Sequence, residues 1–189
     1  MTSAGSLEVS TFSLPPLTLV IGGARSGKSR IAERLVVLSG RPRYYLATAQ
    51  AFDDEMRARI DRHIQDRGDG WNTIEAPLQL APILAKCQPK FTLLLDCATL
   101  WLSNHLLSGS DLEVESEKLL SALADCPCPV VIVSNETGWG IVPENKLARE
   151  FRDAQGRLNQ RLAAQAGLVL GVMAGLPFAL KGQMPDALK

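Results

Sequence analysis

Long apolar runs are missing from this sequence, and so is an excess of charge of either sign. No stretch approaches the roughly 20 consecutive apolar residues that a membrane-spanning helix needs, so we expect no membrane span. The 189 residues include 20 Lys plus Arg and 20 Asp plus Glu. This balance provides no bulk positive field for nucleic acid or a membrane surface, so we expect neither as a partner.

Histidine and cysteine are also scarce, with two of the former and four of the latter. The cysteines lack the C-x-x-C pairs of a structural zinc site. Cys126 and Cys128, separated by one proline, could belong to a redox or metal site. In a cytoplasmic chain, such cysteines are more often reduced and pack as small apolar side chains. We therefore expect a cytoplasmic protein with four reduced cysteines: Cys87, Cys97, Cys126 and Cys128.

The chain is organised around residues 17–35. A β-prone apolar run leads into residues 22–29, which fit the phosphate-binding pattern G-x-x-x-x-G-K-S, and a helical segment follows. Glycines let backbone N–H groups approach a phosphate, and the helix start adds its positive dipole end. Lys28 can neutralise the β- and γ-phosphates, and Ser29 can hold Mg²⁺. A chance glycine turn is the alternative, but strand, loop and helix occur in the required order. The sequence predicts nucleoside triphosphate binding.

Strand-like and helix-like segments alternate along the chain. Strands are expected at residues 17–21, 43–48, 71–74, 91–95, 130–133, 168–173 and 177–180, and helices at 29–38, 53–67, 78–85, 98–107, 112–123 and 144–166. This pattern predicts one α/β domain of the P-loop NTPase type, with a mostly parallel central sheet and helices on both faces. Ligands then bind at the carboxyl ends of the strands. We expect a polar N-terminal leader over residues 1–16 and the domain over 17–189.

Asp96 and His63 are the other candidates for chemistry. Asp96 ends an apolar strand, where an acidic residue holds Mg²⁺ in phosphate-loop enzymes, although such an Asp can also simply cap a helix. His63 lies between Arg59 and Arg67 at helical i−4 and i+4 spacing, an arrangement that suits a nucleophile attacking a phosphate. From this pattern alone, a solvated surface helix is the more common explanation. The other histidine, His105, lies on a mostly apolar segment and is expected to be structural or on the surface.

Further motifs follow the phosphate loop in unbroken order. They read YLATAQ at residues 45–50, DDEM at 53–56, RIxxH at 59–63, WxTxE at 71–75, LLD at 94–96, SNExGxGIVPEN at 134–145, FRD at 151–153 and GRxNQR at 156–161. With GGARSGKSR at residues 22–30, this series resembles the bifunctional adenosylcobinamide kinase / adenosylcobinamide-phosphate guanylyltransferase family of cobalamin biosynthesis. A phosphate loop alone would be weak evidence for that family, whereas the whole series is strong.

The resemblance implies two reactions in one chain. With ATP or GTP, the enzyme would phosphorylate adenosylcobinamide. It would then transfer GMP from GTP to adenosylcobinamide phosphate through a guanylyl-histidine, giving adenosylcobinamide-GDP. His63 and Lys28 are the implied catalytic residues, and Ser29 and Asp96 the implied Mg²⁺ ligands. The implied nucleotide contacts are Gly22, Gly23, Ala24, Arg25, Ser26, Gly27, Lys28, Ser29, Ala47, Thr48, Ala49, Ile64, Gln65, Asp66, Arg67, Glu75 and Asp96.

The resemblance and the long helix at residues 144–166 also favour a homo-oligomer, with a trimer as the suspected form. Two other functions stay open at this point. One is a phosphate-loop small-molecule kinase that has no covalent step. The other is a regulatory protein that hydrolyses nucleotides slowly.

Overall fold

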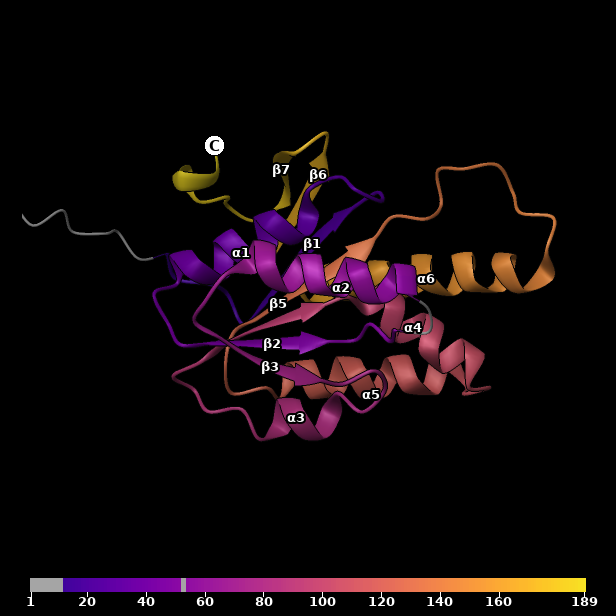
Figure 1. The fold of residues 1–189 in the computed structure, drawn as a ribbon, viewed down its shortest axis with the longest axis horizontal. Helices are drawn as coiled ribbons and strands as arrows, with labels where there is room; N and C mark the ends of the chain where they lie inside the picture. The colour runs from indigo at the N-terminus through magenta and orange to yellow at the C-terminus, as the bar shows by residue number, and fades with distance from the viewer. Residues whose placement is uncertain (1–11, 52–53) are drawn as a thin grey trace, which may run out of the picture.

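The computed structural model describes residues 12–51 and 54–189, with the backbone but not every side chain of residues 54–67 (Figure 1). Its sheet has the strand order β3-β2-β4-β5-β1-β6-β7. The strands are β1 (Leu17–Gly22), β2 (Arg43–Ala47), β3 (Trp71–Glu75), β4 (Thr92–Asp96), β5 (Val130–Asn135), β6 (Leu168–Met173) and β7 (Leu176–Lys181). Every predicted strand is present, with ends shifted by at most two residues.

The helices also follow the predicted order. They are α1 (Lys28–Leu38), α2 (Asp54–Arg67), α3 (Ala81–Ala85), α4 (Ala98–Leu107), α5 (Leu112–Ala124) and α6 (Lys146–Gln165), and a 3₁₀ turn, Asp186–Leu188, comes last. Helix α3 starts three residues later than predicted, with Pro82 in its first turn, where a missing N–H is harmless. Helix α6 starts after Asn145, whose side chain accepts a hydrogen bond from the Ala148 N–H at 3.2 Å. The predicted start of α2 at residue 53 lies outside the described residues.

Helices cover both faces of the sheet, as predicted. On one face, α1 packs against β-strand side chains that include Val20, Leu94 and Val131. On the other face, α3 to α6 contribute to a core that contains Leu19, Leu95 and Ile132. Strands β1 to β6 pair in parallel, so their carboxyl ends meet along one edge. The structure therefore confirms the α/β fold and makes this edge the place to look for a site.

Strand β7 is the exception to the parallel pattern. It pairs antiparallel with β6 across a two-residue turn, Ala174–Gly175, in which both residues have positive φ (51° and 81°). Such turns match the twist of the strands they join, and glycine adopts this conformation without strain. The turn lies at the carboxyl edge, next to the phosphate loop.

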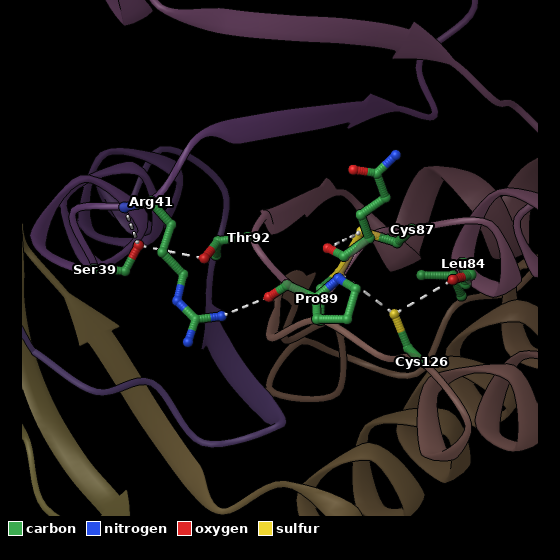
Figure 2. The surroundings of a disulfide bond; sticks show 9 residues. Ser39, Arg41, Leu84, Cys87, Pro89, Thr92 and Cys126 are labelled. Carbon is green, nitrogen blue, oxygen red and sulfur yellow. Dashed lines mark hydrogen bonds between the residues drawn. A yellow bond between two sulfur atoms is a disulfide. The ribbon is translucent and has the colours of Figure 1, made fainter.

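A disulfide joins Cys87 to Cys128, so the expectation that all four cysteines are reduced is wrong (Figure 2). The two residues lie 41 positions apart in sequence, but their Cα atoms are 6.3 Å apart. Cys87 follows α3 and Cys128 precedes β5, and the fold brings these two connections together. Cys126 stays free, with its sulfur 3.6 Å from that of Cys128, and Cys97 is free and buried. Sequence spacing alone could not reveal this neighbourhood.

The chain before β1 is described from residue 12 onward, so most of the predicted leader lies outside the described residues. The Phe12 N–H donates to the Leu38 carbonyl at 3.0 Å, Leu14 is buried against the α1 face, and the Pro16 carbonyl accepts from Val130 N–H at 2.9 Å. No helix in residues 12–51 or 54–189 is long and apolar enough to cross a bilayer. The boundary at residue 16 stays a prediction.

Candidate nucleotide-binding site

The loop between β1 and α1 has the geometry of an anion cradle. Gly27, with φ of 93°, precedes α1 and supplies no side-chain cap, and the first turn of the helix contains no acidic residue. Gly23, just before the exposed tip of the loop, accepts hydrogen bonds at its carbonyl from Ser26 N–H at 3.3 Å and Lys28 Nζ at 3.2 Å. The positive end of the helix and the lysine charge therefore lie at one place, as phosphate binding requires.

Close packing explains why this loop starts with glycine. A Cβ on Gly22 would lie 2.5 Å from the Val172 carbonyl oxygen and 2.6 Å from Ser26 Oγ, whereas one on Gly23 would meet nothing within 4 Å. The β6–β7 turn supports the loop from behind, because Gly175 N–H donates to the Ser26 carbonyl at 2.9 Å. Sequence reasoning missed this contact. Its only sequence signal was an Ala-Gly pair between two apolar runs.

Asp96 lies at the same edge, at the end of β4. One strand, β5, separates it from the phosphate loop, in the order β4-β5-β1. Burial raises the pKa of the neighbouring Cys97 thiol to about 11; the Asp96 charge adds to the rise and the Lys28 charge opposes it. Both charges therefore act on one thiol, at the end of β4. Ser29 and Asp96 offer a hydroxyl and a carboxylate, oxygen donors of the kind that Mg²⁺ prefers, so these residues fit the predicted metal.

The predicted residues after β2 are locked to the end of β4. Thr48 is buried, and its hydroxyl donates to the Cys97 carbonyl at 2.8 Å and accepts from the Cys97 N–H at 2.7 Å. Asn104 Nδ2 donates to the Thr48 carbonyl at 2.9 Å. Half-buried Ala47 and Ala49 flank Thr48, and exposed Glu75 pairs with Ala47 at the next strand end. The fold thus brings these four predicted residues to the edge that carries Asp96.

Tyr45 lies just below them and was not predicted as a site residue. Burial raises the pKa of its phenol well above the usual range, and the charge of the nearby Asp96 carboxylate raises it further. The Arg67 guanidinium lies 3.5 Å from the centre of the Tyr45 ring, and Arg67 Nη2 donates to Thr73 Oγ1 at 3.0 Å. Arg67, at the end of α2, therefore packs against the sheet.

His63 has a different environment. Its side chain is exposed on α2, as are those of Ile64 and Gln65, so these residues are not buried at the carboxyl edge of the sheet. Of the two arginines expected beside His63, Arg67 is held by Tyr45 and Thr73. The side chains of Arg59 and Asp66 lie outside the described part of the chain. The phosphate loop and Asp96 thus lie at the same edge of the sheet, whereas the His63 side chain is exposed on a separate helix.

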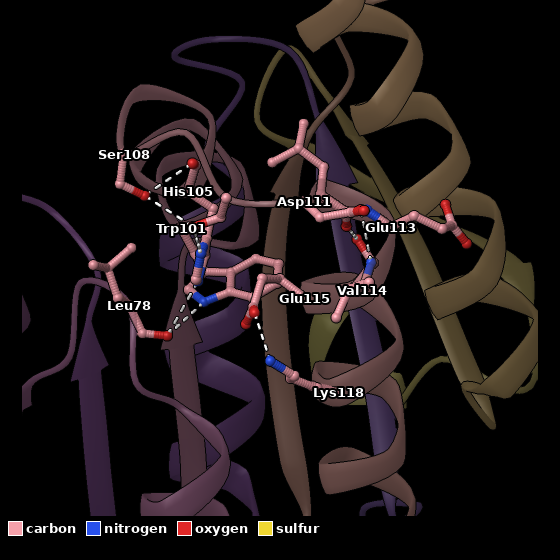
Figure 3. Close-up of polar contacts among 12 residues, drawn as sticks. Leu78, Trp101, His105, Ser108, Asp111, Glu113, Val114, Glu115 and Lys118 are labelled. Carbon is pink, nitrogen blue, oxygen red and sulfur yellow. Dashed lines mark hydrogen bonds and ion pairs between the residues drawn. The ribbon is translucent and has the colours of Figure 1, made fainter.

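His105 was expected to be structural or on the surface, and the structure confirms the first alternative (Figure 3). Only 3% of its surface is exposed, and its ring packs edge-on against Trp101 with centroids 4.7 Å apart. Nδ1 is 3.1 Å from Ser110 Oγ, and Nε2 is 3.4 Å from the Leu78 carbonyl oxygen. Trp101 Nε1 donates to the same carbonyl at 2.9 Å. Both ring nitrogens therefore have internal partners.

Asn135, at the end of β5, is a second residue that sequence reasoning missed. It pairs with Gly22, and its backbone is held by Thr99 Oγ1, which accepts from its N–H at 2.7 Å, and by Asn159 Nδ2, which donates to its carbonyl at 3.0 Å. The adjacent Glu136 N–H donates to the Gly22 carbonyl at 3.1 Å. These bonds fix the strand between Asp96 and the phosphate loop. A polar residue at the end of an apolar run was the available signal.

Comparisons with known proteins agree with the motif series. The family model for cobinamide kinase / cobinamide phosphate guanyltransferase matches residues 18–180. The chain is 47% identical over 168 residues to the bifunctional adenosylcobalamin biosynthesis protein CobP of Pseudomonas aeruginosa, covering 87% of this chain and 97% of that protein. It is 42% identical over 181 residues to the bifunctional protein CobU of Escherichia coli, covering 87% and 99%. Among solved structures, the RadB recombinase aligns with a TM-score of 0.51 and 17% identity, over 84% of this chain and 74% of that one, a likeness of fold only.

Proposed function

The chain belongs to the cobinamide kinase / cobinamide phosphate guanyltransferase family, and we propose that His63 carries GMP between its two substrates. The enzyme is a bifunctional kinase and guanyltransferase of adenosylcobalamin biosynthesis. One observation carries the proposal. Of its two histidines, His105 is buried with both ring nitrogens engaged, whereas His63 is exposed.

In the kinase step, the phosphate loop binds ATP or GTP, and the hydroxyl of adenosylcobinamide attacks the γ-phosphorus. The bond between that phosphorus and the bridging oxygen of the β-phosphate breaks, ADP or GDP leaves, and the hydroxyl proton passes to water. Backbone N–H groups at the start of α1 and the Lys28 ammonium stabilise the charge on the phosphate oxygens. Ser29 and Asp96 would hold Mg²⁺, which when bound neutralises further charge on those oxygens. This step needs positioning and electrostatics, and no covalent bond to the enzyme.

In the transferase step, a His63 ring nitrogen attacks the α-phosphorus of GTP. A P–N bond forms, the bond between that phosphorus and the β-phosphate oxygen breaks, and pyrophosphate leaves. A phosphate oxygen of adenosylcobinamide phosphate then attacks the same phosphorus. The P–N bond breaks, adenosylcobinamide-GDP is released and His63 is regenerated. A covalent intermediate divides one difficult displacement into two easier ones. An exposed side chain suits this role, because two bulky substrates must reach it in turn.

Incubation with GTP and Mg²⁺, without corrinoid, tests the proposal. Intact-mass spectrometry should show one added GMP, in a bond labile to acid and stable to base, as expected for phosphorus bound to nitrogen. His63→Ala should abolish the adduct and the transferase reaction, while phosphorylation of adenosylcobinamide largely survives.

His105→Gln is the matched control, because it removes the other imidazole and keeps an amide that can hydrogen-bond at the same place. This variant should still form the adduct. Retention of GMP by His63→Ala would exclude His63 as the carrier. A folded wild-type enzyme that makes adenosylcobinamide-GDP without any adduct would instead indicate direct transfer.

A further inference from the structure

Tyr45 lies between Asp96, at the edge that carries the phosphate loop, and Arg67, at the end of the helix that carries His63. It lies on β2 two residues before Ala47, which pairs with Asp96 across the sheet. Because alternate residues of a strand share a face, and paired residues of parallel strands do too, Tyr45 and Asp96 project from the same side of the sheet. Tyr45 pairs with Leu94, two residues before Asp96, and its hydroxyl is close enough to the Asp96 carboxylate for that charge to raise the pKa of the phenol. One end of this side chain therefore lies beside the predicted metal ligand.

The ring of Tyr45 contacts Arg67 of α2, the helix that carries His63. The Arg67 guanidinium covers its face at 3.5 Å, and the indole of Trp71 meets it edge-on with centroids 6.0 Å apart. Arg67 is the last residue of α2, one helical turn beyond His63. Where their side chains are described, the other residues of α2 are mostly exposed. The stack and the bond from Arg67 to Thr73 are thus the described side-chain contacts that hold the end of α2 against the sheet.

We propose that Tyr45 is a positioning residue for both reactions: its hydroxyl orients Asp96, and its ring, through Arg67, holds the helix that presents His63. This rests on the proposed roles of His63 and Asp96. The two functions of Tyr45 belong to different atoms. A phenol donates one hydrogen bond to a carboxylate and so fixes its rotamer. The aromatic face attracts a guanidinium whether or not the hydroxyl is present.

Because the atoms differ, two substitutions separate the functions. Tyr45→Phe keeps the ring and removes the hydroxyl. It should raise the Mg²⁺ concentration for half-maximal kinase activity by about fivefold, the effect of losing one hydrogen bond of typical strength. Guanylylation of His63, followed by intact mass at saturating Mg²⁺, should stay within about twofold of wild type because the stack is intact.

The second substitution tests the ring. Tyr45→Leu removes the aromatic face, and its rates are compared with those of Tyr45→Phe, because both variants lack the hydroxyl. It should slow guanylylation about fivefold when Arg67 is present, the size of a partly buried cation–π contact. In the R67M background, the same change should have almost no effect, since the guanidinium has already been removed. If Arg67 instead contacts the nucleotide directly, R67M alone would slow guanylylation. The difference between Y45F and Y45L would then be the same with and without Arg67.

Each arm can contradict the proposal. An Mg²⁺ titration of Y45F that overlays the wild type would exclude the hydroxyl as a positioning group for Asp96. An equal slowing from Y45F to Y45L with and without Arg67 would exclude the stack. Far-UV circular dichroism confirms that each variant is folded before its rates are compared. Failure of the guanylyl-histidine proposal itself looks different, because then the wild-type enzyme forms no adduct.

Discussion

Helices α1 and α2 lie over the same face of the sheet, but the fold holds them in very different ways (Figure 1). Helix α1 buries four residues, and the loop before it is tied to β6–β7 through Gly175. The described side chains of α2 are mostly exposed, apart from Arg67 at its end and half-buried Ile60. A nucleotide cradle must keep its donors in fixed places, whereas a carrier of GMP must meet two substrates in turn. The difference in packing agrees with the proposed roles of Lys28 on α1 and His63 on α2.

The largest expected effect comes from the disulfide, which lies far from both helices in the sequence. Replacing Cys87 and Cys128 together by Ala opens a loop of 41 residues and should lower the free energy of unfolding by about 4 kcal/mol. Chemical denaturation measures this change. Both cysteines are replaced because Cys126 lies next to Cys128 and could pair with it. Cys126→Ser, which keeps a donor for Leu84, should have little effect and is the control.

Hydrogen exchange should separate the helices directly. Amides of α1 around buried Ile31 and Leu35 should exchange only on global unfolding. Those of α2 should exchange by local opening, at a free energy at least about 3 kcal/mol below that of global unfolding. The disulfide variant sharpens this test, because it should reduce protection in α1 by the full loss of about 4 kcal/mol and protection in α2 by at most about 1 kcal/mol. Equal protection of the two helices in the wild type would contradict the comparison.

Glycine substitutions test how tightly the phosphate loop before α1 is packed. Gly22→Ala should cost about 2 kcal/mol of stability and weaken nucleotide binding, since the new Cβ would meet a backbone carbonyl at 2.5 Å. Gly23→Ala is the matched control: its Cβ meets nothing within 4 Å, so stability should change by less than about 0.5 kcal/mol. Thermal unfolding and calorimetry give both quantities. Equal stability losses would mean that the β6–β7 hairpin does not confine the loop.

Lys28→Ala should act on binding without affecting the fold. Removing the charge beside the phosphates should weaken nucleotide binding at least tenfold, or about 1.4 kcal/mol, and reduce both reactions. Isothermal titration calorimetry measures the affinity. Lys86→Ala removes the same charge from an exposed position after α3 and should bind normally. Unchanged affinity in Lys28→Ala would exclude the loop as the nucleotide site.

The smallest expected effect concerns the metal. Asp96→Asn keeps the shape of the side chain but removes its charge, so kinase activity should require about fivefold more Mg²⁺. Asp125→Asn, an exposed change beyond α5, should leave the Mg²⁺ titration unaltered. If Asp96→Asn also leaves it unaltered, Asp96 is not a metal ligand.

Local patterns in the sequence determined most of the fold and the centre of the site. Residues 22–29 are contiguous, so the strand, the glycine loop and the helix start could be predicted together, and the apolar runs located every strand within two residues. The role of His63 is a different case. Its helical spacing was more typical of a solvated surface than of a nucleophile, and its side chain is in fact exposed. The motif series, and not the spacing, made it a candidate.

Only the tertiary structure decided which distant residues meet. The Cys87–Cys128 bond, the support of Ser26 by Gly175 and the stack of Arg67 on Tyr45 each join segments whose order in the sheet no local pattern reveals. Backbone propensity and hydrophobic periodicity act over a few residues, and so they specify elements. Contacts between elements depend on strand order and register, which are set by the packing of the whole chain.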